Sequence, residues 1–356
     1  MKKAKRSLAM VLAMVMMLLV TSCGSGQASS SKPADASSSA AASTETPVSD
    51  GKVYTIKLGS AVAVEHPQNQ AAEMIQKLCE ERSNGRLVVE WYPAEQLGAE
   101  ATMIENLQLG LQDAMLGSSE IYSNYCADFN ILGMAFAFES AEHVQNFFDS
   151  DVFKVSLDKL SNDYNIKIIS LGFQKNPRAI FGKKPIEEPA DLEGVKFRVP
   201  SIPIWEKNFR QLGAVPVVVA WSEYPFALLQ GVVDAGEATY ESIYSMKLHE
   251  AAPYISLLDY AYPVEALSMS QKTWDSLPSD LQEIFQEAVD EAAVWYSEKI
   301  AADWEIDKQK IIDEGGQFFD PDKTLWIEKM APLAEQLESE GYWDTPGLYE
   351  LVQEMK

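Results

Sequence analysis

The sequence predicts an α/β protein of two similar lobes crossed by one unusually long helix. Three observations lead to this fold class. Segments of alternating apolar residues, typical of strands, are interspersed with segments of helical periodicity. Short sequences from the first half recur in the second half at nearly the same offsets. A run of about 35 residues that begins after Pro278 keeps helical spacing of its apolar side chains.

The first half alternates strands with helices. The predicted elements are a strand over 53–59, a helix over 68–84, a strand over 87–92, a helix that ends at Leu109 and a strand over 112–116. Gly85 and Gly110 follow the two helices as stop signals, and Pro93 ends the second strand. Strands that alternate with helices favour an α/β architecture.

The second half repeats parts of the first. The matching pairs are Gln96-Leu97-Gly98 with Gln211-Leu212-Gly213, residues 106–114 with 228–235, and Ile121-Tyr122-Ser123 with Ile243-Tyr244-Ser245. Each repeat contains a helix, a glycine and a strand. Two lobes built from such units would bring their strand ends to a shared cleft.

The long helix is predicted to start at Ser279, where Ser279 and Gln282 have the spacing of a capping box. It runs to Gly315-Gly316, and about 35 residues at 1.5 Å give roughly 52 Å. A helix of this length could lie across both lobes. A coiled coil is the alternative, which the aromatic content and the single helix disfavour.

A short strand in residues 191–200 carries the main candidate binding residue. Val195, Phe197 and Val199 alternate with Lys196 and Arg198, and Pro200 ends the strand. Arg198 therefore lies at a carboxyl strand end, where open α/β sheets bind ligands. Its guanidinium offers a rigid fork of donors that suits a carboxylate.

The N-terminus indicates export and anchoring. Residues 1–22 have a basic start and an apolar stretch, as in a signal peptide, and small residues precede Cys23. This junction resembles the lipobox of bacterial lipoproteins, in which the cysteine becomes lipidated; an ordinary secretory signal is the alternative. Residues 23–50 would then be the lipidated Cys23 and a flexible Ser/Ala-rich tether.

Composition and missing motifs exclude several classes of protein. The formal net charge of −24 over 356 residues disfavours nucleic acid as a partner. The three histidines lie far apart, and no cysteine pair has metal-ligand spacing. No nucleophile elbow, P-loop or dinucleotide motif occurs, so we expect no enzyme activity, no cofactor and no metal. Cys79 and Cys126 are interpreted as buried apolar residues, with one disulfide as the alternative.

The ordered set of motifs resembles the extracytoplasmic solute-binding proteins of TRAP (tripartite ATP-independent periplasmic) transporters, of the dicarboxylate-binding type. The matching stretches are Glu65-His66-Pro67, Gln96-Leu97-Gly98, residues 189–200, Leu212-Gly213-Ala214, Ser222-Glu223-Tyr224, residues 227–234, residues 243–250 and residues 272–278. Together they cover nearly all of 53–330. The resemblance implies a periplasmic-binding-protein-like fold, with lobe I in 51–175 plus about 264–303 and lobe II in 176–263 plus about 304–350.

The resemblance also implies a function. Such a protein closes on a small organic acid outside the cytoplasm and delivers it to TRAP membrane subunits; here it would be held to the membrane by its lipid anchor. Two alternatives remain, a binding component of an ABC-type importer and a ligand-sensing lipoprotein without a transport role. Neighbouring genes for an ATPase subunit would identify the first, and unimpaired uptake after deletion would favour the second.

Site residues follow from the resemblance. Arg198 would grip the ligand carboxylate, Arg178 would assist, and Trp221 would pack on the ligand. The further candidate ligand-binding residues are Glu237, Glu120, Tyr240 and His66. Where the family usually has Asn-Pro after the glutamate, this chain has Ala238-Thr239. We therefore expect a changed pocket wall at Ala238.

Overall fold

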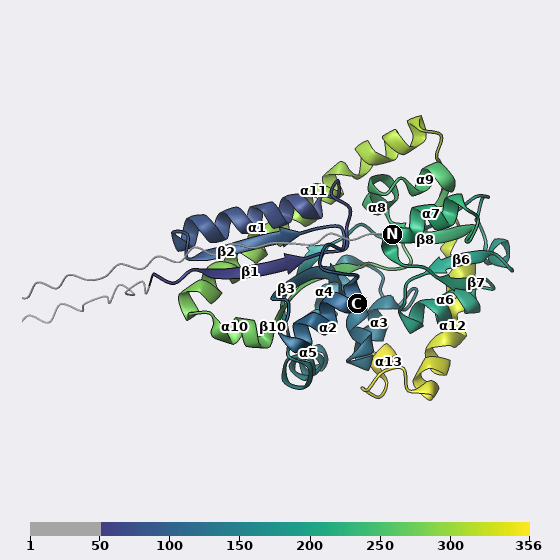
Figure 1. The fold of residues 1–356 in the computed structure, drawn as a ribbon. Coiled ribbons are helices and arrows are strands. Elements are labelled where there is room, and N and C mark those ends of the chain that lie inside the picture. The colour runs from purple at the N-terminus through teal and green to yellow at the C-terminus, as the bar shows by residue number, and fades with distance from the viewer. Residues whose placement is uncertain (1–50) are drawn as a thin grey trace, which may run out of the picture. The chain divides into compact units, whose positions relative to one another are not determined.

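The computed structural model describes residues 51–356, which contain two β-sheets covered by helices (Figure 1). The proposed signal peptide, Cys23 and the tether lie outside the described residues. The strands are β1 Tyr54–Gly59, β2 Leu87–Tyr92, β3 Ala114–Ser118, β4 Ile166–Gln174, β5 Arg178–Gly182, β6 Lys196–Val199, β7 Val215–Val218, β8 Ala235–Thr239, β9 Tyr254–Ser256, β10 Val264–Ser270 and β11 Gln317–Phe319. The α/β fold class with two sheets is confirmed.

Short and long helices connect these strands. They are α1 Gln68–Ser83, α2 Glu100–Leu109, α3 Asn130–Gly133, α4 Ala141–Phe148, α5 Asp151–Tyr164, α6 Pro203–Gln211, α7 Tyr224–Leu229, α8 Tyr240–Ser245, α9 Leu248–Ala251, α10 Gln271–Ser276, α11 Ser279–Asp313, α12 Lys323–Glu340 and α13 Leu348–Gln353. Four 3₁₀ segments lie at η1 Ser119–Asn124, η2 Ala127–Phe129, η3 Pro189–Leu192 and η4 Trp221–Glu223.

The first sheet has the strand order β2-β1-β3-β10-β4 and the second has the order β11-β9-β5-β8-β6-β7. In the first sheet, β10 pairs antiparallel with both β3 and β4, although it follows them by a long stretch of chain. In the second sheet, β6 pairs parallel with β7 and β8, so their carboxyl ends lie at one edge. The two sheets are linked directly by the short connection from β4 to β5.

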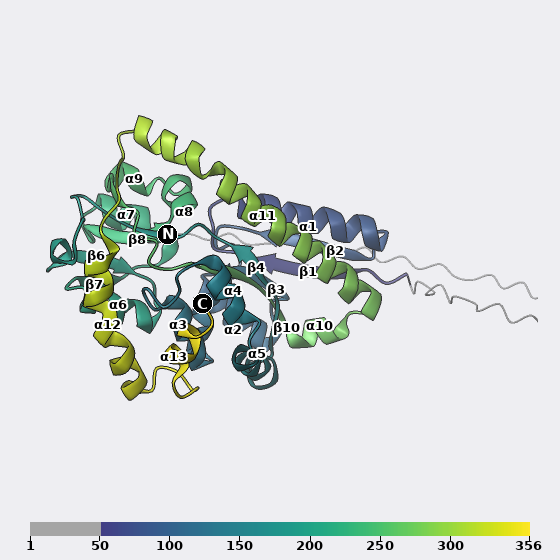
Figure 2. The same cartoon turned by 180° about the vertical axis from the view of Figure 1, so that it is seen from behind.

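The predicted long helix is present as α11, with 35 residues. It packs on α1 and β4 beside the first sheet and then reaches α8 beside the second (Figure 2). Its buried side includes Phe285, Val289 and Tyr296 in the core that α1 and the first sheet share. The expected capping box is wrong: Pro278 occupies the cap position without a side-chain bond, and Gln282 donates to the carbonyl of Trp274 instead.

Apolar packing continues across the region between the sheets. One cluster joins Met115 and Phe129 of the first part to Phe197, Trp205 and Phe209 of the second. The rings of Phe197 and Phe209 stack with centroids 3.9 Å apart. Cys79 and Cys126 are both buried and both free, which confirms their interpretation as apolar core residues. Within 51–356, every helix is too short or too polar to cross a membrane.

Candidate functional site

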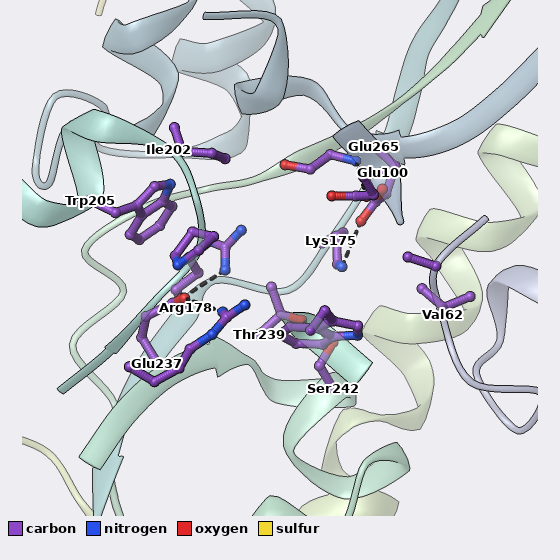
Figure 3. A pocket seen from close by; sticks show the side chains of 15 residues that line it. Val62, Glu100, Lys175, Arg178, Ile202, Trp205, Glu237, Thr239, Ser242 and Glu265 are labelled. Atoms are coloured by element: carbon purple, nitrogen blue, oxygen red, sulfur yellow. Dashed lines mark hydrogen bonds and ion pairs between the residues drawn. The ribbon is translucent and has the colours of Figure 1, made fainter. Parts of the chain in front are cut away.

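A cavity of about 80 Å³ lies where strand ends of the two sheets meet. This is several times the ~10–15 Å³ that one water molecule requires by the same kind of measure, so a small organic molecule could enter. The lining residues are Ala61, Val62, Glu100, Ser118, Lys175, Arg178, Arg198, Pro200, Ile202, Trp205, Trp221, Glu237, Thr239, Ser242 and Glu265. Figure 3 shows how these side chains converge on the cavity. Carboxyl ends of β3, β6 and β8 contribute to it, as expected for an α/β binding edge.

Arg178 enters the cavity from the first residue of β5, directly after the Asn176-Pro177 turn. Its Nη1 donates to Oε2 of Glu237 at 2.7 Å, and its Nη2 lies 3.4 Å from Oε1 of Glu120. The guanidinium carbon lies 4.7 Å from the ring centroid of Trp205. Burial alone would lower the pKa of Arg178, but the charges of Glu237 and Glu120 outweigh it and raise the pKa. Arg178 is thus a buried, permanently charged group.

Arg198 reaches the same cavity from β6 and is 3% exposed. Its Nε and Nη2 donate to the carbonyl of Val219 at 3.1 and 3.0 Å, which fixes the plane of the guanidinium. The guanidinium carbon lies 4.6 Å from the ring centroid of Tyr224 and 5.3 Å from that of Trp221. Burial lowers the pKa of Arg198 from its ordinary value, yet an arginine stays charged in proteins.

Glu237 connects the two arginines from β8. Its Oε2 accepts from Arg178 and from the hydroxyl of Tyr260 at 3.2 Å. Its Oε1 lies 3.7 Å from Nη1 of Arg198 and has no hydrogen-bond partner among residues 51–356, although the side chain is 1% exposed. The two guanidinium groups therefore already share one carboxylate inside the cavity.

A second charged group centres on Lys175, in the link between β4 and β5. Its Nζ lies 2.7 Å from Oε1 of Glu265 and 3.7 Å from Oε1 of Glu241. Burial would lower the pKa of Lys175, but the charges of Glu265 and Glu241 raise it. Lys175 is therefore a charged ammonium held between two buried carboxylates.

Glu100, on the first turn of α2, lies beside this group (Figure 3). Its Oε1 accepts the backbone N–H of Ser118 at 3.2 Å. Burial, reinforced by the charge of Glu265, raises the pKa of Glu100 to about 7. Glu100 therefore exchanges a proton near neutral pH.

The raised pKa predicts a pH-dependent stability difference between the protein and its Glu100→Gln variant. A carboxyl with a raised pKa in the folded state contributes stability below its unfolded pKa, and this contribution is lost as the pH rises toward the folded pKa. As the pH rises from about 4.5 to about 8, the unchanged protein should lose this contribution and Glu100→Gln should not. The difference in free energy of unfolding between the two proteins should therefore shift by on the order of 1–3 kcal/mol in favour of the variant. Urea unfolding at both pH values measures this, with the exposed Glu105→Gln on α2 as the control; a constant difference would contradict it.

The structure brings four predicted site residues to the cavity: Arg198, Arg178, Trp221 and Glu237. Glu120 is buried behind them in contact with Arg178. Tyr240 lies elsewhere, because its ring stacks on Trp304 with centroids 4.1 Å apart and its hydroxyl donates to Asp259. His66 is also away from the lining, and its Nδ1 accepts the backbone N–H of Gln68 at the start of α1.

The Ala238-Thr239 departure has a different effect from the expected one. Side chains alternate along β8, so Glu237 and Thr239 face the cavity while Ala238 faces the core. Ala238 is fully buried in the apolar cluster that includes Phe181. The expectation that Ala238 alters the cavity wall is therefore wrong, and Thr239 is the residue of this pair that lines the cavity.

Sequence reasoning missed several lining residues. They are Glu100, Lys175, Trp205, Ser242 and Glu265. Lys175 had a usable signal, because it precedes the same Asn-Pro turn that pointed to Arg178. Glu100 and Glu265 had none, since they are 165 positions apart and meet only through the position of β10 next to β3.

No metal site accompanies these groups in residues 51–356, where no three His, Cys, Asp or Glu side chains are arranged to hold an ion.

The model of the family described as bacterial extracellular solute-binding protein, family 7 (DctP), matches residues 58–340. The C4-dicarboxylate-binding periplasmic protein DctP of Rhodobacter capsulatus is 27% identical over 288 residues, covering 79% of this chain and 86% of that protein. A solute-binding protein of Roseobacter denitrificans is 26% identical over 298 residues, covering 80% and 91%.

Solved structures of TRAP periplasmic solute binding proteins are also similar to this chain. A TRAP periplasmic solute binding protein from Ochrobacterium anthropi with bound L-fuconate superposes with a TM-score of 0.79 at 25% identity, covering 85% of this chain and 99% of that one. Another from Fusobacterium nucleatum, with bound sn-glycerol-3-phosphate, also has a TM-score of 0.79 at 25% identity, covering 84% and 96%. Both neighbours hold a small anionic solute.

Proposed function

Because the chain belongs to the bacterial extracellular solute-binding proteins of family 7, the DctP family of TRAP solute-binding proteins, we propose that it captures a small organic acid through its carboxylate. The observation that carries this proposal is the convergence of Arg178 and Arg198 on one carboxylate, Glu237, inside a cavity. A ligand carboxylate is the same chemical group and can bind the N–H donors of both guanidinium groups that Glu237 leaves unused. Trp205 and Trp221 would flank the ligand.

The geometry supports a defined role for each arginine. Two of the five N–H donors of Arg198 are used by Val219, which leaves three for a ligand. The Nε of Arg178 is buried and has no hydrogen-bond partner in the described part of the chain, so it can also donate. Both groups are desolvated, and a charge-assisted pair in such surroundings is strong if its geometry is good.

The same proposal covers location and partners. The protein would lie outside the cytoplasm, with the lipid anchor on Cys23 and the tether in residues 23–50. It would deliver the solute to TRAP membrane subunits. We place the two lobes at 51–175 plus about 264–303 and 176–263 plus about 304–350, joined by the β4–β5 link and by α11. Ligand capture would close these lobes over the cavity.

A thermal-shift screen of the purified protein tests the carboxylate requirement. The panel contains dicarboxylates, sugar acids, aromatic acids and amino acids, each paired with the amide that replaces its carboxylate. A ligand at about 100 times its dissociation constant adds roughly 2.7 kcal/mol of stability, which raises the melting temperature measurably. We expect shifts from acids only. Equal shifts from the amides, or no shift across the panel, would contradict the proposed function.

A further inference from the structure

Carboxylates outnumber cations around the cavity. Within the described residues, the cations that line it are Lys175, Arg178 and Arg198. The carboxylates that line it or contact these cations within 4 Å are Glu100, Glu120, Glu237, Glu241 and Glu265. A ligand that is only an anion would add to this excess of negative charge in a site shielded from water, which is costly.

Glu100 is the carboxylate whose charge is not balanced. The other four lie within 4 Å of a cation: Glu120 and Glu237 contact arginines, and Glu241 and Glu265 contact Lys175. Glu100 has no ion pair among the described residues, and its single hydrogen bond, from Ser118, uses Oε1. Its Oε2 therefore remains available as an acceptor. Burial and the charge of Glu265 raise the pKa of Glu100, and the more distant ammonium of Lys175 offsets this only in part.

The unbalanced carboxylate lies across the cavity from the arginines. Arg178, Arg198 and Glu237 come from β5, β6 and β8 of the second sheet, whereas Glu100 and Glu265 come from α2 and β10 on the side of the first sheet. Figure 3 shows Glu100 and Glu265 together on one side of the cavity and Arg178 with Glu237 on the other. A ligand that satisfies both sides needs an anionic end and a cationic end, separated by a short chain.

We infer that the ligand is a small zwitterion whose carboxylate binds Arg178 and Arg198 and whose protonated amine lies between Glu100 and Glu265. This inference rests on the proposed function for its carboxylate end. The unpartnered Oε1 of the buried Glu237 supports it as well, because a second donor on the ligand can reach that oxygen once the carboxylate engages the arginines.

A dicarboxylate fits the far side of the cavity poorly. Its second carboxylate would need a free cation there, and the cation present is Lys175. That ammonium already lies 2.7 Å from Glu265 and 3.7 Å from Glu241. A second carboxylate would thus compete with two buried partners, and it would meet Glu100 as a like charge whenever Glu100 is ionised.

Binding of matched acids to the purified protein, measured by calorimetry at neutral pH, tests the inference. The probes are straight-chain acids of about three to six carbons whose far end is an ammonium, a hydroxyl, a methyl or a second carboxylate, together with D-glucuronate. At one chain length, the amino acid should bind on the order of tenfold or more tighter than its hydroxyl counterpart, as expected for hydrogen bonds to a charged group.

Two variants locate the amine. Glu100→Gln should weaken binding of the amino acid on the order of tenfold or more and change binding of the hydroxyl counterpart far less, because the amide keeps the shape but loses the charge. Glu105→Gln, exposed on the same helix, should change neither. Equal loss for both probes would assign Glu100 a structural role and overturn the inference.

The outcomes separate the two proposals. If dicarboxylates or D-glucuronate bind and the amino acids do not, the inference is wrong while the proposed function stands. If no acid of any kind binds, the proposed function is wrong and the inference fails with it.

Discussion

Replacement of Arg198 by alanine should weaken acid binding by roughly 2–5 kcal/mol, or about 30-fold to several thousand-fold. The guanidinium is buried, held by Val219 and placed against Tyr224, so its remaining donors are oriented before a ligand arrives. Its loss removes one of two cations that face Glu237 and leaves the ligand carboxylate competing for Arg178 alone. Calorimetry with a ligand from the screen measures the change.

Arg198→Lys should bind the acid almost as weakly as Arg198→Ala, although lysine keeps the positive charge. One ammonium cannot hold the Val219 carbonyl and a ligand in the same plane as the guanidinium does. Arg210→Ala is the matched control, because this arginine is exposed on α6 and, within residues 51–356, forms an ion pair only with Glu206, at 3.4 Å. Unchanged affinity in Arg198→Ala would refute the assignment of Arg198 to the ligand.

Substitution of Gly236 by alanine should destabilise the protein by about 1–3 kcal/mol or more. A Cβ atom at this position of β8 would lie 1.6 Å from the hydroxyl oxygen of Tyr224 and 2.7 Å from its Cζ. Tyr224 is fully buried, and its hydroxyl donates to the carbonyl of Glu237 at 3.3 Å, so it cannot swing aside freely. Either β8 or the ring must shift, which would also displace Glu237. Urea unfolding measures the loss.

A double-mutant cycle identifies the cause. Tyr224→Phe removes the oxygen that the new methyl group would strike, at the cost of one hydrogen bond. The two substitutions together should therefore cost less than the sum of their separate effects. Simple additivity would mean that the clash with Tyr224 is not the source of the destabilisation.

Periodicity predicted the elements that lie on one continuous stretch of chain. The expected helix after Pro278 is α11, Ser279–Asp313, and Gly110 ends α2 in the left-handed conformation that a glycine adopts readily. Arg198 lies on its predicted strand for the same reason: alternation in a strand fixes which residues share a face.

Pairing between distant segments could not be predicted in this way. Glu100 and Glu265 become neighbours because β10 inserts beside β3, and periodicity carries no information about strand order. The predicted capping box at Ser279 is wrong because the cap position falls on Pro278, which has no N–H to donate, and Gln282 donates to the carbonyl of Trp274. Ala238 points away from the cavity because it directly follows the cavity-facing Glu237 on β8, and successive side chains of a strand face opposite sides.

The position of β10 also sets the order in which the first sheet can be completed. β10 separates β3 from β4 in the sheet, yet it follows β4 by about 90 residues of chain. Until β10 is in place, one edge of β3 and one edge of β4 are open. A chain truncated before residue 264 should therefore bind holding chaperones and remain sensitive to protease, whereas the full-length protein should resist protease.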